Sequence, residues 1–155
     1  MKSIPKFIAC LILCFGAAAI GGLFTQSSVN TWYAQLTNPE FSPPNWVFAP
    51  VWNVLYFLMA VSLYHIWVSG KEKGKTVAMT VFMVQLVMNV SWSAVFFGMR
   101  SPSGGFSMII VLLLAIVGTI FSFSRISAKS ACFLLPYLVW VCFAGYLNYH
   151  LWVLN

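Results

Sequence analysis

The chain has 155 residues, of which 61% are hydrophobic and only 6% are charged. A soluble domain is about half apolar and about a quarter charged, so this composition excludes a water-soluble globular protein. The formal net charge of +6 does not indicate nucleic-acid binding. The few basic residues lie in short gaps between long apolar stretches, where they are typical of membrane topology signals and of contact with anionic lipid.

The charged residues divide the chain into long apolar stretches. These cover residues 7–24, 46–68, 77–98, 106–123 and 131–153. About 20 apolar residues suffice for an α-helix to cross a bilayer, and backbone polar groups in lipid must pair within the segment. The sequence therefore predicts an all-α membrane protein, a single transmembrane domain over residues 1–155 built as a five-helix bundle.

The first stretch, residues 7–24, has a second interpretation. Lys2 and Lys6 precede an apolar run that could end near the small residues Ala17, Ala18 and Ala19, an arrangement that also resembles a secretory signal peptide with its cleavage site. The apolar run continues through Leu23 and Phe24, which makes it longer than a usual signal core. We therefore interpret it as the first transmembrane helix.

The basic residues predict the orientation. With five crossings, one side holds Lys2, Lys6, Lys71, Lys73, Lys75, Arg125 and Lys129. The opposite side has only Arg100. The positive-inside rule then places the N-terminus in the cytoplasm, and the C-terminus and the loop of residues 25–45 outside. This bias favours a bacterial plasma membrane.

The predicted outer loop, residues 25–45, is rich in proline and aromatic residues. It contains Trp32, Tyr33, Pro39, Phe41, Pro43 and Pro44. Proline restricts its own backbone and that of the preceding residue. A solvated loop also rarely carries this many aromatic side chains. We expect this long loop to pack back onto the bundle as a semi-rigid lid.

Uncharged polar and aromatic side chains recur at helical spacing within three predicted helices. They are Trp52 and Tyr56 in the second, Gln85, Asn89 and Trp92 in the third, and Trp140, Ala144 and Asn148 in the fifth. Offsets of three, four and seven place such residues on one helical face. These faces either hold the helices together by hydrogen bonds and aromatic contacts or line a cavity that the lid closes.

Acid–base catalysis has no obvious site in this sequence. The only acidic residues, Glu40 and Glu72, lie on opposite predicted sides of the membrane. No ionisable acid lies within a predicted helix, which also argues against proton or ion transport. The cysteines and the two histidines are not spaced as metal ligands, so no metal site is predicted.

Three motifs carry a family resemblance. They are W-Y-x-x-L-x-x-P-x-F-x-P-P-x-W-V-F-A-P-V-W-x-x-L-Y from Trp32 to Tyr56, Q-L-x-x-N-x-x-W-S-x-x-F-F-G from Gln85 to Gly98, and L-P-Y-x-x-W-x-x-F-A-x-x-L-N from Leu135 to Asn148. In order and spacing they resemble the first loop and second helix, the third helix and the fifth helix of the translocator protein family. These proteins are also called tryptophan-rich sensory proteins, or the TspO/MBR family.

The resemblance implies a five-helix bundle with a cavity, open toward the first loop, that binds flat apolar molecules. Porphyrins such as protoporphyrin are the expected ligands, with sterols and benzodiazepine-type compounds in some members, and no further cofactor is required. Carried over by position, the implied ligand contacts are Tyr33, Trp52, Asn89, Trp140, Ala144 and Asn148. The helix faces described above add Tyr56, Gln85 and Trp92.

A porphyrin is favoured over a sterol. The sterol motif proposed for animal members needs a basic residue soon after a tyrosine, and none follows Tyr149. A porphyrin ring can stack on Trp52, Trp140 and Tyr33 in an apolar cavity. Its carboxylates would then point toward Arg100 or into solvent.

The main prediction is a membrane receptor or binding protein linked to tetrapyrrole sensing or handling. Two alternatives are light-dependent porphyrin breakdown, with Trp52 and Trp140 as the reactive residues, and transport or shuttling of porphyrin or sterol. A purely structural protein would bind no specific ligand. The small residues Ala94 and Gly98 favour a homodimer through the third helix, or they only ease packing within one monomer.

Overall fold

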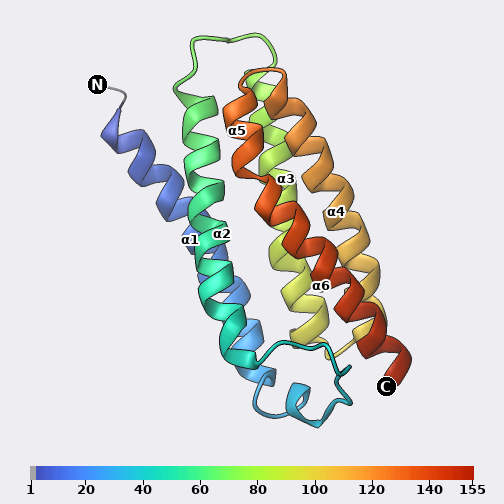
Figure 1. Ribbon diagram of the computed structural model, residues 1–155. Coiled ribbons are helices and arrows are strands. Elements are labelled where there is room, and N and C mark those ends of the chain that lie inside the picture. Colours follow the sequence, from blue (N-terminus) through green and yellow to red (C-terminus); the bar gives the residue numbers. More distant parts are fainter. Residues whose placement is uncertain (1–2) are drawn as a thin grey trace.

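The computed structural model describes residues 3–155, and within that range every regular element is helical (Figure 1). In chain order the elements are α1 (Ile4–Ser28), η1 (Tyr33–Gln35), α2 (Asn45–Trp67), α3 (Lys75–Ser93), η2 (Ala94–Gly98), α4 (Pro102–Ser124), α5 (Ala128–Phe133) and α6 (Leu135–Leu154). Five segments are long and apolar enough to cross a membrane. The predicted all-α, five-helix fold is therefore confirmed.

The fifth predicted span is not one continuous helix. It is divided into α5 and α6, and the break lies at Leu134. Pro136, in the first turn of α6, has no N–H to donate to the preceding turn, and its ring clashes with a continuing helix. The predicted span over residues 131–153 is confirmed within Ala128–Leu154, and the helix break at Leu134 lies inside it.

The third span changes its winding before it ends. After Ser93 the α-helix continues as the π-turn η2, in which the Met99 N–H donates to the Ala94 carbonyl over 2.9 Å. A π-turn widens the helix locally and often marks a functional site. Phe96 and Phe97 on this turn are both buried, so the widened turn carries two aromatic rings into the bundle.

The basic residues gather at one end of the bundle. In Figure 1 the start of α1, the α2–α3 loop and α5 lie at the upper end, whereas the α1–α2 loop and the C-terminus lie at the lower end. The described basic residues of the upper end are Lys6, Lys71, Lys73, Lys75, Arg125 and Lys129. Lys2 lies outside the described residues. We call this end the basic end; which side of a membrane it faces stays a prediction.

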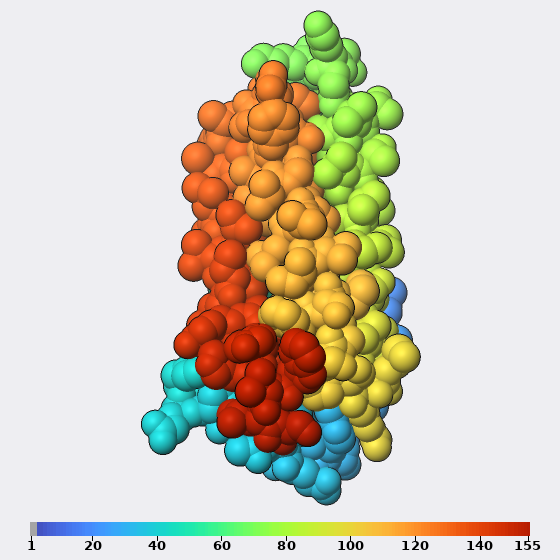
Figure 2. Space-filling view, turned by 90° about the vertical axis from the view of Figure 1, so that its right-hand side faces the viewer, coloured from blue at the N-terminus to red at the C-terminus, as the bar shows by residue number. Residues whose placement is uncertain are grey.

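The loop between α1 and α2 packs back onto the bundle, as expected. The Phe41 ring stacks on Tyr146 with the centroids 5.0 Å apart. The side chain of Asn155 accepts from the Thr37 N–H over 2.9 Å and donates to the Thr37 carbonyl over 3.1 Å. Figure 2 shows the end of α6 lying beside this loop. We call residues 29–44 the lid.

Candidate ligand-binding cavity

A cavity of about 780 Å³ lies between α1, α2, α3, η2 and α6, at the lid end of the bundle. This volume is within the range of small-molecule sites, roughly 300–1,000 Å³. Its lining includes eight of the nine predicted site residues: Tyr33, Trp52, Tyr56, Asn89, Trp92, Trp140, Ala144 and Asn148. None of the lining side chains is acidic or basic, so the cavity suits an uncharged, mainly apolar group.

Aromatic rings form a stack along one wall of this cavity. The Trp52 and Trp92 ring centroids are 6.4 Å apart with planes inclined by 28°, and those of Trp92 and Phe96 are 5.6 Å apart with planes inclined by 14°. Phe48 meets Trp140 edge to face at 5.9 Å. Near-parallel rings at these separations are favourable aromatic contacts, and a flat ligand can add to such a stack.

Gly105 permits the position of Phe96. A Cβ atom at Gly105 would lie 2.5 Å from Phe96 Cδ2 and 3.2 Å from Asn148 Oδ1. Only a residue without a side chain allows α4 to approach η2 and α6 this closely. The aromatic wall therefore depends on a glycine of α4, a helix that does not itself line the cavity.

A chain of hydrogen bonds crosses the inner end of the cavity. The Tyr56 hydroxyl donates to Asn89 Oδ1 over 2.5 Å, Asn89 Nδ2 donates to the Tyr137 hydroxyl over 2.9 Å, and that hydroxyl donates to Gln85 Oε1 over 2.9 Å. All four side chains are buried. Because buried polar groups are costly unless paired, this chain fixes the orientation of the Asn89 amide at the cavity surface.

Gln85 is the predicted site residue that does not line the cavity. It lies on the same face of α3 as Asn89 but one helical turn deeper, where it accepts from Tyr137 and contacts Met59. In the structure Gln85 supports Asn89 from behind, and a direct ligand contact by Gln85 stays a prediction. Tyr137, which the helical-face argument omitted, connects the two amides.

A second set of hydrogen bonds holds Trp92 and Asn148. Trp92 Nε1 donates to Asn148 Oδ1 over 3.0 Å, and Asn148 Nδ2 donates to the Pro102 carbonyl over 3.0 Å. These bonds tie α3, α6 and the start of α4 together. Trp140 differs, because its buried Nε1 has no hydrogen-bond partner among the residues that the structure describes. A bound acceptor atom would satisfy that donor.

The lid contributes Tyr33 to the cavity. This side chain is 6% exposed and its ring lies 6.2 Å from Phe96 and 5.7 Å from Phe97. Burial raises the pKa of the Tyr33 hydroxyl above its ordinary value, an effect that a hydrogen bond with Ser42 partly offsets. Tyr33 is therefore a neutral phenol at physiological pH, with its ring packed against η2.

The cavity opens sideways between α1 and α2. Its exposed lining residues all belong to these two helices: Ala19, Leu23, Gln26, Asn45, Ala49 and Asn53. They lie on the half of each helix nearest the lid. The opening expected toward the first loop thus lies on the flank of the bundle, where lipid would surround a membrane protein.

The α1 wall was missed by sequence reasoning. Phe15, Ala18, Gly21 and Gly22 line the cavity, but they contain no polar atom that could distinguish a cavity face from ordinary packing. The polar residues Thr25 and Gln26 at the lid end of α1 also line the cavity, but they were predicted as part of the outer loop. The spacing of small residues on α1 indicated close helix approach, and a Cβ at Gly21 would indeed lie 3.3 Å from Ser93 Oγ on α3.

The small residues at the end of the third span also pack within the chain. A Cβ atom at Gly98 would lie 2.9 Å from Phe24 Cδ1 of α1. This contact favours the alternative in which Ala94 and Gly98 ease packing inside one monomer. A homodimer through these residues stays a prediction.

The family comparison agrees with this architecture. The sequence pattern of the TspO/MBR family matches residues 9–153. The chain belongs to the TspO/MBR family. It is 40% identical to a tryptophan-rich protein TspO of Archaeoglobus fulgidus, over 99% of each chain. It is 38% identical to a protein of the same name from Chlorobaculum tepidum, over 99% of this chain and 98% of that one.

An animal relative is similar over a slightly shorter range. The translocator protein of Bos taurus is 36% identical over 86% of this chain and 80% of its own length. Family membership and the five membrane-spanning helices together identify this chain as an integral membrane protein. Within residues 3–155, no three His, Cys, Asp or Glu side chains are close enough to hold a metal ion.

Proposed function

We propose that this protein binds flat, apolar tetrapyrroles, porphyrins above all, and acts as a membrane receptor or handling protein for them. One observation carries the proposal: an uncharged cavity of about 780 Å³ is walled by the stacked rings of Trp52, Trp92 and Phe96. A broad aromatic ring gains both apolar burial and stacking in such a space. The relatives named translocator and tryptophan-rich protein are consistent with this role.

The polar groups of the cavity would orient the ring. The unpaired Trp140 Nε1 supplies a donor for an acceptor on the ligand, and the Asn89 amide is held in place at the inner end. The cavity lining has no cation for the propionates, so these groups would point out of the lid end of the cavity, toward Arg100 or solvent. Arg100, which is exposed beyond η2 at the lid end, is the cation available there.

A titration with protoporphyrin in the dark tests this function. Purified protein in nanodiscs is titrated while its tryptophan fluorescence is followed, beside the variants Ala144→Phe and Ala128→Phe. Ala144 is buried and lines the cavity, so a phenyl ring at this position occupies ligand space. Ala128 is exposed on α5 and serves as the control.

The proposal predicts saturable binding at micromolar concentration or below, weakened at least tenfold by Ala144→Phe and unchanged by Ala128→Phe. Non-saturable quenching that is equal in all three proteins would mean that protoporphyrin only partitions into the membrane. The structural alternative, a protein with no specific ligand, would then be favoured.

Light-dependent porphyrin breakdown is a second candidate, because three indoles line the same cavity and two of them, Trp52 and Trp140, have different surroundings. Trp52 is part of the ring stack, whereas Trp140 lies on α6 and packs edge to face with Phe48. Phe substitutions at Trp52 and Trp140 should keep dark binding but change the photoproducts under illumination in air. Unchanged products and rates would exclude these indoles as reactive groups.

Transport or shuttling of porphyrin or sterol makes a separate prediction. It requires net movement of ligand across sealed vesicles, whereas receptor binding does not. Flux measured on the same preparation that is used for the titration distinguishes the two functions.

A further inference from the structure

A second hollow of about 320 Å³ lies at the basic end of the bundle, between α1, α2 and α3. Its lining is apolar apart from one indole N–H and one thiol: Ala9, Cys10, Leu13, Leu63, Trp67, Met79 and Met83. It shares no lining residue with the larger cavity. We call it the lipid hollow, for the reasons that follow.

The hollow is open to the surroundings of the bundle. Ala9 on α1 and Met83 on α3 are exposed at its edge. In Figure 1 the N-terminal part of α1 slants away from the other helices. In an integral membrane protein, an apolar hollow on this flank faces lipid chains rather than water.

A cation lies against one of the residues that line the hollow. Lys6 precedes Cys10 by one helical turn, and its Nζ atom lies 5.5 Å from the centroid of the Trp67 ring, which lines the hollow. The ammonium group therefore lies over the face of an aromatic ring that lines the hollow. From Lys6 to Leu13 the helix rises roughly 10 Å, at ~1.5 Å per residue, so an apolar slot continues below the charge.

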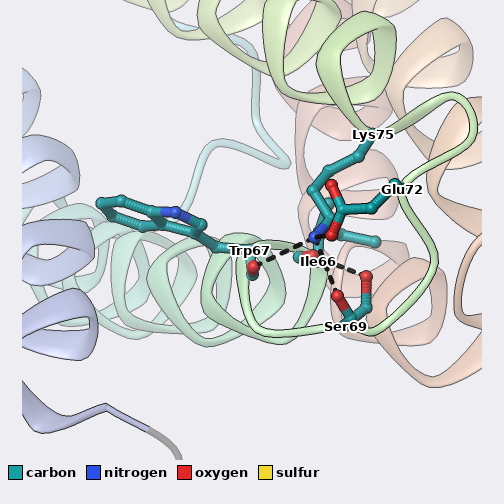
Figure 3. Close-up of polar contacts among 5 residues, drawn as sticks. All are labelled: Ile66, Trp67, Ser69, Glu72 and Lys75. Atoms are coloured by element: carbon teal, nitrogen blue, oxygen red, sulfur yellow. Dashed lines mark hydrogen bonds and ion pairs between the residues drawn. The ribbon is translucent and has the colours of Figure 1, made fainter.

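The Lys6 charge has no acidic partner within residues 3–155. Glu72 is the acidic residue at the basic end, and it is paired with Lys75 over 2.6 Å. Figure 3 shows why this pair is fixed: Lys75 Nζ also donates to the Ser69 carbonyl over 2.8 Å and approaches the Trp67 carbonyl at 3.4 Å. Lys75 thus binds the carbonyls at the end of α2 and pairs with the Glu72 carboxylate.

We propose that the lipid hollow binds one acyl chain of an anionic phospholipid whose phosphate group pairs with Lys6. The chain fills an apolar space that otherwise faces the bilayer, and the phosphate supplies the missing counter-charge. Lys71 and Lys73 on the neighbouring loop are exposed and add to the positive potential at this end. A zwitterionic phospholipid fits the hollow equally well but gains less from Lys6, because its own cation opposes the lysine.

The site is independent of the proposed porphyrin function and differs from ordinary lipid contact in a measurable way. Native mass spectrometry of the detergent-solubilised protein, with equal amounts of phosphatidylglycerol and phosphatidylcholine, reports how much of each lipid remains bound. Lys6→Gln removes the charge and Ala9→Phe fills the hollow. Lys129→Gln removes an exposed lysine of α5 at the same end that does not border the hollow.

The wild type should retain one phosphatidylglycerol in preference to phosphatidylcholine. Lys6→Gln should weaken phosphatidylglycerol binding about fivefold, which is the effect expected of one basic residue near an anionic surface. It should also remove the preference for phosphatidylglycerol over phosphatidylcholine. Ala9→Phe should reduce binding of both lipids, and Lys129→Gln should change neither. Equal retention of the two lipids by the wild type, or equal losses in Lys6→Gln and Lys129→Gln, would overturn the proposal.

Discussion

The Tyr137 hydroxyl offers a direct test of how the inner end of the cavity is held. Tyr137→Phe keeps the ring, which is 1% exposed, but deletes the hydrogen bonds to Asn89 and Gln85. One hydrogen bond between membrane helices contributes ~0.6 kcal/mol on average, with a maximum near ~1.7 kcal/mol. Two such bonds therefore predict a loss of about 1–3 kcal/mol in the free energy of unfolding.

The same change should weaken porphyrin binding even though Tyr137 does not line the cavity, because the Asn89 amide loses one of its two fixed partners. Unfolding by a denaturing detergent in mixed micelles measures the stability, and the dark titration measures binding. Tyr149→Phe is the matched control, since Tyr149 is exposed. If Tyr137→Phe and this control both lie within about 0.5 kcal/mol of the wild type, the hydroxyl chain does not organise the site.

Three further predictions follow from the cavity and the lid. Gly105→Ala places a methyl group against Phe96, so it should cost about 1–3 kcal/mol of stability and weaken porphyrin binding. Gly16→Ala is the control, because its added Cβ meets open space, and it should change neither stability nor binding. Arg100→Gln should weaken protoporphyrin binding about two- to fivefold, the range expected of one exposed ion pair, and leave binding of its dimethyl ester unchanged; equal effects on both ligands would remove Arg100 from the account. The raised pKa of Tyr33 means that the packed lid favours the neutral phenol, so this contribution is complete below the ordinary value of about 10 and is lost as the pH rises through the higher folded value. Proteolysis of the lid should therefore accelerate only above about pH 10, and Tyr33→Phe should lack that step.

The fold could be predicted because apolar length alone determines it. The five apolar runs fix five helices, since no other structure satisfies the backbone of a short segment in lipid. The break before α6 was not predicted, although Pro136 was the residue that could have indicated it, because proline cannot continue a helix from the residues before it. The π-turn η2 was not readable, since no residue of that segment requires it and its winding depends on how Phe96 and Phe97 pack.

The helix faces that line the site could be predicted, but the position at which the cavity ends along each helix could not. Helical periodicity places Gln85 and Asn89 on one face of α3, but it does not say that the cavity ends between them. The contribution of α1 was missed because Gly21 and Gly22 offer no polar side chain and because Thr25 and Gln26 were assigned to the outer loop. The lipid hollow could not be predicted for a similar reason. Its residues are ordinary membrane residues, and only the arrangement of α1, α2 and α3 leaves a space between them.

The central claim is that a porphyrin binds in the cavity, and the most direct test is to locate the bound porphyrin. A paramagnetic manganese porphyrin added to protein labelled at its alanine methyl groups broadens the signals near the bound metal. The account predicts saturable broadening of Ala18 and Ala144, which line the cavity, and none of Ala78, which is buried on α3 and does not. Equal, non-saturable broadening of all exposed alanines, with Ala144 unaffected, would show that the cavity is not the porphyrin site.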